Sequence, residues 1–158
     1  MKFRFVIAGL LFIAAAPAYA IPLTPGGAAV IARVIGPCGE ACVVRSNSGG
    51  SIVYFEDAAS VIRQARKKLI IDGFCASACM VMADQARPRT CITERAVFAY
   101  HNTNREYPIP LRRDLHRWIM RHGGYPAFHG RPGIMPNEVA QRFFPRCKST
   151  QPATVANL

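Results

Sequence analysis

The sequence predicts a small protein of the α/β class, and three observations lead to that expectation. Its 158 residues suit one domain rather than two. Short apolar segments alternate along the chain with segments whose apolar residues recur at helical spacing. With 51% hydrophobic and 18% charged residues, the chain can bury a core. Because strands that alternate with helices favour parallel pairing, we expect a parallel sheet.

The first 20 residues have the pattern of a secretory signal peptide. Lys2 and Arg4 precede an apolar run over residues 5–16, and an A-x-A cleavage site ends at Ala20. The run is too short for a transmembrane helix, which needs about 20 apolar residues. We therefore expect cleavage after Ala20 and a periplasmic or secreted mature chain.

The expected strands are apolar segments that end at turn residues. Residues 28–35 are apolar and β-branched and stop at a Gly-Pro turn, and residues 42–46 stop at Asn47. The segments expected to form strands are 28–35, 42–46, 68–71 and 96–100.

The expected helices follow apolar residues spaced three and four apart, as at Leu111, Leu115, Trp118 and Ile119. The segments expected to form helices are 57–68, 75–83, 111–122 and 136–144. Residues 123–136 are rich in Gly and Pro and are expected to be irregular. The domain would span residues 21–148, and residues 149–158 would form a flexible tail.

The chain is strongly basic, with a formal net charge of +11. Its Lys and Arg residues are scattered, and no nucleic-acid-binding motif accompanies them, so we expect no specific nucleic-acid partner. Acidic partners such as lipid headgroups or anionic wall polymers remain open.

All six cysteines follow residue 20, and an even number after a signal peptide indicates disulfides. Six cysteines allow 15 pairings, which sequence alone does not decide. The alternative is a zinc site made by two C-x3-C pairs, but structural zinc sites usually use C-x2-C and export favours oxidation. We expect no metal and no cofactor. The six cysteines are Cys38, Cys42, Cys75, Cys79, Cys91 and Cys147.

Three features suited to acyl transfer occur in order along the chain. Ser48-Gly49-Gly50 follows an expected strand, Ser77 stands where a strand leads into a helix, and His101 ends a strand. A serine at a helix start lies near free N–H groups that favour a developing anion, and a nearby histidine can act as its base. Each feature also has a purely structural interpretation: a helix cap, a turn and a strand-end histidine.

The same residues resemble the proteolytic subunit of the Clp protease (ClpP). Residues 47–51 resemble its SPGG segment, residues 73–78 its G-x-A-A-S-M serine motif, and residues 95–101 its R-V-M-I-H strand. The chain is more similar still to small exported ClpP-like proteins of Gram-negative bacteria, which carry a C-x-S-A-C serine motif. The resemblance covers roughly residues 42–102.

The resemblance implies a ClpP/crotonase-like fold of ββα units in one small domain braced by disulfides. Ser77 would be the nucleophile and His101 the general base, and the backbone N–H groups of Gly50 and Ala78 would form the oxyanion hole. With Cys79 in the first turn of a helix, we expect a Cys79–Cys91 disulfide and a Cys38–Cys42 disulfide. Cys75 and Cys147 are then left to pair.

The chain departs from the family pattern at the third catalytic residue. The family carries an Asp downstream of its histidine, whereas residues 130–138 contain none. The candidates for this role are Asn137, Glu138 and Asp114. Because an exported protein cannot use a cytoplasmic ATPase, we expect no ATPase partner.

Two functions are therefore open. The first is a serine hydrolase, a peptidase that acts on peptides or proteins through an acyl-enzyme on Ser77. Such a hydrolase could form a homo-oligomer. The second is a catalytically inactive ClpP-like module that binds a partner in the cell envelope through its basic surface. A crotonase-like thioester enzyme is a poor third, since coenzyme A thioesters are not expected outside the cytoplasm.

Overall fold

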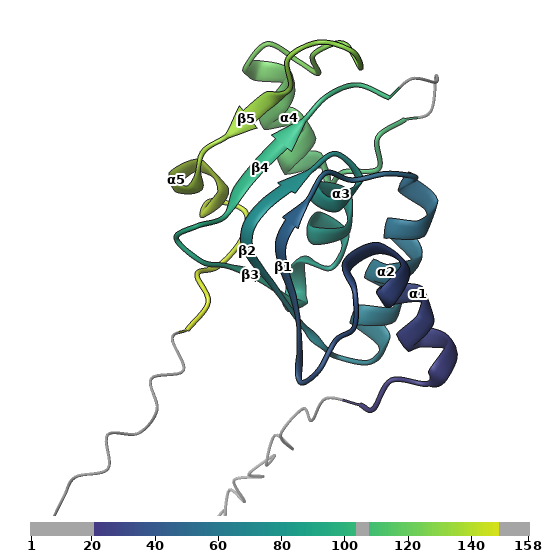
Figure 1. The fold of residues 1–158 in the computed structure, drawn as a ribbon. Helices are drawn as coiled ribbons and strands as arrows, with labels where there is room; N and C mark the ends of the chain where they lie inside the picture. Colours follow the sequence, from purple (N-terminus) through teal and green to yellow (C-terminus); the bar gives the residue numbers. More distant parts are fainter. Residues whose placement is uncertain (1–20, 104–107, 149–158) are drawn as a thin grey trace, which may run out of the picture.

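The computed structural model describes residues 21–103 and 108–148, which form a mixed α/β domain (Figure 1). Its sheet has the order β1-β2-β4-β5, and β3 also pairs with β2. The strands are β1 (Ala41–Asn47), β2 (Lys68–Ala76), β3 (Thr90–Ile92), β4 (Val97–Tyr100) and β5 (Gly133–Met135). The α/β class is confirmed, and this architecture is consistent with a ClpP/crotonase-like fold.

Parallel pairing is confirmed for most of the sheet but not for all of it. β1, β3 and β4 each run parallel to β2, whereas β5 runs antiparallel to β4. β5 lies within residues 123–136, which we expected to be irregular, and it is the edge strand that makes the sheet mixed. This strand has only three residues and lies in a glycine-rich segment, so the composition of the segment does not indicate it.

Three helices lie on one side of the sheet (Figure 1): α1 contacts β1, α3 contacts β2 and β4, and α2 packs against both α1 and α3. The helices are α1 (Pro25–Ile35), α2 (Ile52–Gln64), α3 (Ala78–Gln85), α4 (Arg113–Arg121) and α5 (Asn137–Ala140), with a short 3-10 helix, η1 (Arg87–Arg89), after α3. Each of α2, α3, α4 and α5 overlaps a segment in which a helix was expected.

The strand expected at residues 28–35 is wrong, because these residues lie in α1. The Thr24 hydroxyl accepts a hydrogen bond from the Gly27 N–H at 3.1 Å, and Pro25 occupies the first helical position. Both features favour a helix start over a strand. α1 packs against α2 and β1, and Ile31 is its fully buried residue.

β2 is longer than expected and crosses an irregularity at Gly73. Val44 pairs with Ile71 while Ser46 pairs with Phe74, so β2 holds one extra residue opposite β1. A Cβ on Gly73 would lie 2.0 Å from the carbonyl oxygen of Arg45, so only glycine fits there. Beyond this bulge, β2 continues to Ala76, and Ser77 follows directly at the carboxyl end of the strand.

The core lies between the sheet and the helices, and α3 is its centre. Every α3 residue from Ala78 to Asp84 is buried, which explains its small apolar composition. On the β4 side, Phe98 stacks on Phe144 with ring centroids 5.0 Å apart. The site loops after β1 and β2 are therefore attached to tightly packed elements.

Three disulfides brace the domain. Such bonds are consistent with a protein that is exported to an oxidising compartment. The expected Cys38–Cys42 bond is confirmed. The expected Cys79–Cys91 bond is wrong, and so is the pairing of Cys75 with Cys147. The other two bonds are Cys75–Cys79 and Cys91–Cys147.

Both corrections follow from the strand positions. β2 carries Cys75 to the start of α3, where it meets Cys79 with a Cα–Cα distance of 5.3 Å. Cys147 reaches Cys91 because residues 145–147 run alongside β3, with the Cys147 N–H donating to the Ile92 carbonyl at 2.9 Å. The zinc alternative is not formed, since all four cysteines of the C-x3-C pairs are in disulfides.

The expected signal peptide at residues 1–20 and tail at residues 149–158 lie outside the described residues. Across residues 21–103 and 108–148, no helix is both long and apolar enough to cross a bilayer. The three disulfides fit an extracellular or periplasmic location.

Candidate functional site

The candidate site forms where three parallel strands end. β1, β2 and β4 point the same way, so their carboxyl ends reach one edge of the sheet, the usual position of α/β active sites. Ser48-Gly49-Gly50 follows β1, Ser77 follows β2 and His101 follows β4. The topology therefore brings together the three features that are separate in the sequence.

These residues line one open cleft of about 720 Å³. Ser77 and His101 also form walls of a second, smaller hollow of about 20 Å³, which has room for about one water molecule. The cleft is lined by Ser48, Gly49, Gly50, Ser51, Ile52, Val53, Ser77, His101, Thr103 and Phe128.

Ser77 occupies a sharp turn between β2 and α3. Its backbone has φ 54° and ψ −122°, a conformation that costs residues with a side chain about 1–3 kcal/mol and persists only when the surroundings impose it. The Ser77 N–H is fixed by the Ala99 carbonyl of β4 at 2.9 Å. Ser77 is half-buried, and its side chain makes no capping hydrogen bond to α3, which leaves the hydroxyl available for chemistry.

Gly49 packs directly on this turn. A Cβ at Gly49 would lie 2.7 Å from both the Ala76 carbonyl oxygen and the Ser77 Cβ, and its φ of +89° suits glycine. Asn47 holds the loop, since its Oδ1 accepts the Gly49 N–H at 2.9 Å and its Nδ2 donates to the Val34 carbonyl at 2.6 Å. Sequence reasoning missed Asn47, although an Asn two residues before a Gly is the pattern of an Asx turn.

The two expected oxyanion-hole donors are unpaired. Within the described residues, the backbone N–H groups of Gly50 and Ala78 have no hydrogen-bond partner. The Ala78 N–H is the first of α3, so it also lies at the positive end of the helix dipole. The nitrogen of Ala78 is 3.0 Å from the position of a Cβ on Gly49, which places the two loops against each other.

The His101 ring is oriented by its own chain. Its Nδ1 lies 2.6 Å from the backbone carbonyl oxygen of Asn102, and a carbonyl can only accept. Nδ1 therefore carries the proton, and in the neutral ring Nε2 is the basic nitrogen. The ring edge also contacts Phe128, with centroids 5.2 Å apart.

None of the three candidates for a third catalytic residue contacts His101 in the described part of the chain. Asn137 lies at the opposite end of β4, where its Nδ2 donates to the Thr93 and Ala96 carbonyls at 2.8 and 3.0 Å. Asp114 forms an ion pair with Arg87, and Glu138 is exposed on α5. The Asn102 carbonyl occupies the position beside Nδ1 at which sequence reasoning placed a side chain.

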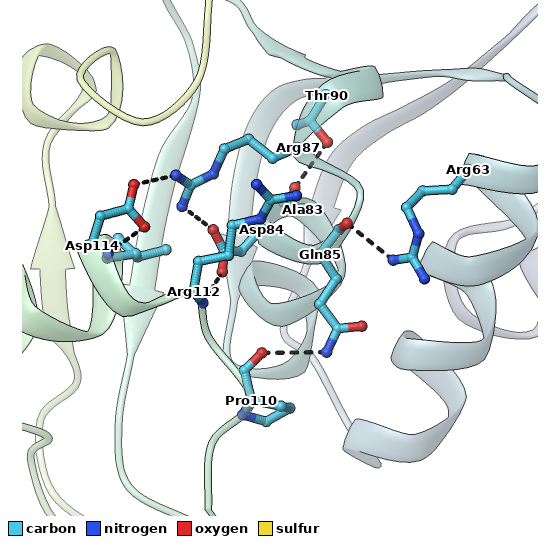
Figure 2. A network of polar contacts seen from close by, with 10 residues as sticks. Arg63, Ala83, Asp84, Gln85, Arg87, Thr90, Pro110, Arg112 and Asp114 are labelled. Atoms are coloured by element: carbon cyan, nitrogen blue, oxygen red, sulfur yellow. Dashed lines mark hydrogen bonds and ion pairs between the residues drawn. The ribbon is translucent and has the colours of Figure 1, made fainter.

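A polar network fixes the segment that returns from the His101 loop to α4 (Figure 2). Arg87 bridges the carboxylates of Asp84 and Asp114, and Asp84 Oδ2 accepts the Arg112 N–H at 2.6 Å. Burial raises the pKa of the Asp84 carboxyl even though Arg87 and the Arg112 N–H oppose the shift. The hydrogen bond from Arg87 lowers the pKa of Asp114. Sequence reasoning missed this network because Asp114 and Arg112 are 27 and 28 residues away from their partners Arg87 and Asp84.

No protein-family model matches this chain, and no curated protein matches it. Among the solved structures that are similar to this chain, one described as that of an enzyme aligns with a TM-score of 0.41 and 11% sequence identity. The alignment covers 66% of this chain and 74% of that one. A likeness this distant carries no argument about family or activity, so the case for function rests on the site itself.

Proposed function

We propose that this chain is an exported ClpP-like serine hydrolase that cleaves peptides or proteins through an acyl-enzyme on Ser77. The observation that carries the proposal is the convergence, at one cleft, of a serine in a strained strand-to-helix turn and a histidine with its Nδ1 proton fixed. Two N–H groups that have no partner among the described residues belong to Ala78, which follows that serine, and to Gly50, which lines the same cleft.

Each group has a defined part in acylation. His101 Nε2 accepts the proton of the Ser77 hydroxyl while Oγ bonds to the substrate carbonyl carbon. The carbonyl oxygen becomes an oxyanion, which the Gly50 and Ala78 N–H groups stabilise, and one such donor is worth about 3 kcal/mol. The protonated imidazole then gives its proton to the leaving amine as the peptide bond breaks.

Deacylation repeats the same steps with water. His101 Nε2 removes a proton from water, the resulting hydroxyl bonds to the acyl carbon, and the proton passes to Ser77 Oγ as the ester breaks. The product is a free carboxylic acid and the enzyme is restored. No cofactor takes part.

The carboxylate of a Ser-His-Asp triad fixes the histidine tautomer and stabilises the imidazolium. The Asn102 carbonyl performs the first of these two functions. It fixes the tautomer of His101, the property whose loss costs about 10⁴ in kcat in serine proteases. It carries no full charge, so it stabilises the imidazolium less than a carboxylate does. We therefore expect a working but slow hydrolase.

The partners and location follow from the same proposal. The substrate is a peptide or protein outside the cytoplasm, and export through residues 1–20 removes the chain from any ATPase. The three disulfides support an oxidising compartment. A specific nucleic-acid partner is not expected.

The test is covalent labelling of the oxidised protein from residue 21 onward with a fluorophosphonate. We expect the parent to be labelled and both Ser77→Ala and His101→Ala to lose labelling. Ser48→Ala is the matched control because Ser48 lines the same cleft, and His122→Ala is the control for histidine because His122 stacks on Trp118 in α4. Labelling that persists in Ser77→Ala contradicts the proposal.

One observation favours the second candidate, an inactive ClpP-like module that binds a partner in the cell envelope. Within the described residues, no hydrogen bond joins the Ser77 hydroxyl to His101, and no carboxylate contacts the imidazole. Catalytic hydrogen bonds often form only with substrate bound, so the hydrolase proposal does not require this bond in the free protein. A folded parent that is not labelled at all points to the binding module, and pull-down on anionic envelope polymers then becomes the next experiment.

A further inference from the structure

We propose that the Cys75–Cys79 disulfide is the positioning device of the nucleophile: it replaces the helix cap that Ser77 gives up to keep its hydroxyl free. The inference rests on the proposed role of Ser77. It assigns to this disulfide a function in chemistry in addition to the stability that any cross-link provides.

The two hydroxyl residues that precede α1 and α3 behave differently. Thr24 uses its hydroxyl to accept the Gly27 N–H and so caps α1. Ser77 stands at the same position before α3 and makes no such bond. A capping hydroxyl would be engaged with the helix and less available as a nucleophile. α3 therefore begins without a side-chain cap, and its first turn needs another restraint.

The disulfide supplies that restraint on both sides of Ser77. Cys75 lies in β2, in register with Asn47 of β1 and Phe98 of β4, so it is fixed within the sheet. Cys79 lies in the first turn of α3, and the two Cα atoms are 5.3 Å apart. Ser77 is the middle residue of this closed loop.

Without the cross-link, the turn has a direct route to relax. Ser77 is one of two non-glycine residues with positive φ among the described residues, and a side chain disfavours that conformation. A change to an ordinary backbone conformation would move the hydroxyl from its present place in the cleft and redirect the Ala78 N–H. Nucleophile and oxyanion donor would then be lost together.

The burial of both cysteines argues for a permanent restraint rather than a redox switch. Cys75 and Cys79 are both 0% exposed, so a soluble reductant reaches these sulfurs only when the surrounding part of the fold opens. The Cys38–Cys42 bond differs in this respect, because Cys38 is partly exposed.

Cys38–Cys42 provides a matched control for the experiment. It closes a loop with the same separation of four residues, so its removal loosens the unfolded chain to the same extent. It joins Cys38, in the turn before β1, to Cys42, the second residue of that strand, at the far end of β1 from the cleft. The variants are Cys75→Ala/Cys79→Ala and Cys38→Ala/Cys42→Ala, each compared with the parent.

The readout is the fluorophosphonate reaction, separated into the probe's dissociation constant and the maximal rate of inactivation. We expect the rate to fall about 10- to 100-fold in Cys75→Ala/Cys79→Ala, with the dissociation constant nearly unchanged, because misplacement by about 1 Å costs that much. The control pair should stay within about twofold of the parent. Equal rates in the two folded variants overturn the positioning role and leave the hydrolase proposal standing, whereas an unlabelled parent overturns both.

A second measurement covers the case in which Cys75→Ala/Cys79→Ala does not fold. The parent is reduced stepwise, the free thiols are alkylated and located by mass spectrometry, and labelling is measured at each step. We expect labelling to survive opening of Cys38–Cys42 and to fall in step with opening of Cys75–Cys79. Labelling that survives opening of Cys75–Cys79 contradicts the inference.

Discussion

The two ends of β4 differ in how fully their polar groups are paired. At the amino end, the Asn137 amide satisfies the Thr93 and Ala96 carbonyls, and the Cys91–Cys147 disulfide ties the C-terminal segment to β3. At the carboxyl end, Ser77 is strained and the Gly50 and Ala78 N–H groups are unpaired among the described residues. Unpaired donors and backbone strain cost stability and are useful where a reaction needs them. We infer that the amino end holds the fold and the carboxyl end performs the chemistry.

The largest effect should come from a methyl group added at the carboxyl end. Gly49→Ala places a Cβ against Ala76 and Ser77 at a positive φ, so we expect fluorophosphonate labelling to fall about 100-fold. Gly39→Ala is the control because nothing lies within 4 Å of its added Cβ, and it should label like the parent. Normal labelling of Gly49→Ala would show that the close approach of the two loops is not needed for the reaction of Ser77.

At the amino end, removal of an amide should affect stability alone. Asn137→Ala leaves two backbone carbonyls without their donor, so we expect it to lower the free energy of unfolding by about 1–3 kcal/mol. Urea unfolding measures the loss, and the labelling rate of the folded variant should be unchanged. Glu138→Ala, on the exposed side of α5, should change neither. A large loss of labelling in a stable Asn137→Ala would contradict this division of roles between the two ends of β4.

A smaller effect separates strain from chemistry at the carboxyl end. Glycine tolerates φ 54° and ψ −122°, so Ser77→Gly should be about 1 kcal/mol more stable than Ser77→Ala, although both lose labelling. Thermal and urea unfolding of the two variants measure the difference. A Ser77→Ala variant that is the more stable of the two would show that the turn is not strained.

The smallest effect is electrostatic and lies near the amino end. The Arg95 hydrogen bond and charge, together with Thr93, lower the pKa of Asp72. A carboxyl with a lowered folded pKa adds stability above its unfolded pKa of 3.8 and loses it as the pH falls through the folded value. Asp72→Asn should therefore be slightly less stable than the parent at neutral pH, with the difference shrinking in acid. Urea midpoints measured from pH 7 down to pH 3 test the sign.

The sequence predicts the carboxyl end of the sheet better than the rest of the fold. Residues 68–83 carry a local pattern, an apolar strand, a turn and small helix-packing residues, and Ser77 lies at their junction as expected. Residues 28–35 mislead because β-branched residues also pack in helices, whereas Thr24 and Pro25 are typical of a helix start. Composition alone does not separate a strand from a helix in this segment, and the capping residues do.

Long-range features were beyond the reach of sequence reasoning. The Cys91–Cys147 bond depends on the C-terminal segment returning to β3, which no local pattern encodes. The same holds for the Asp84–Arg87–Asp114 network and for the antiparallel β5. The Asn102 carbonyl is invisible to a search for side chains, because every residue carries one.

The central claim is that Ser77 is an activated nucleophile, and trapping of an acyl-enzyme tests it most directly. The oxidised protein is mixed with an activated acetyl ester, quenched in acid, digested and mapped by mass spectrometry. We expect the acetyl group on the peptide that contains Ser77 in the parent and in Ser48→Ala, and its absence in His101→Ala. A folded parent with no acetyl group on Ser77, or the same amount in parent and His101→Ala, would contradict the claim.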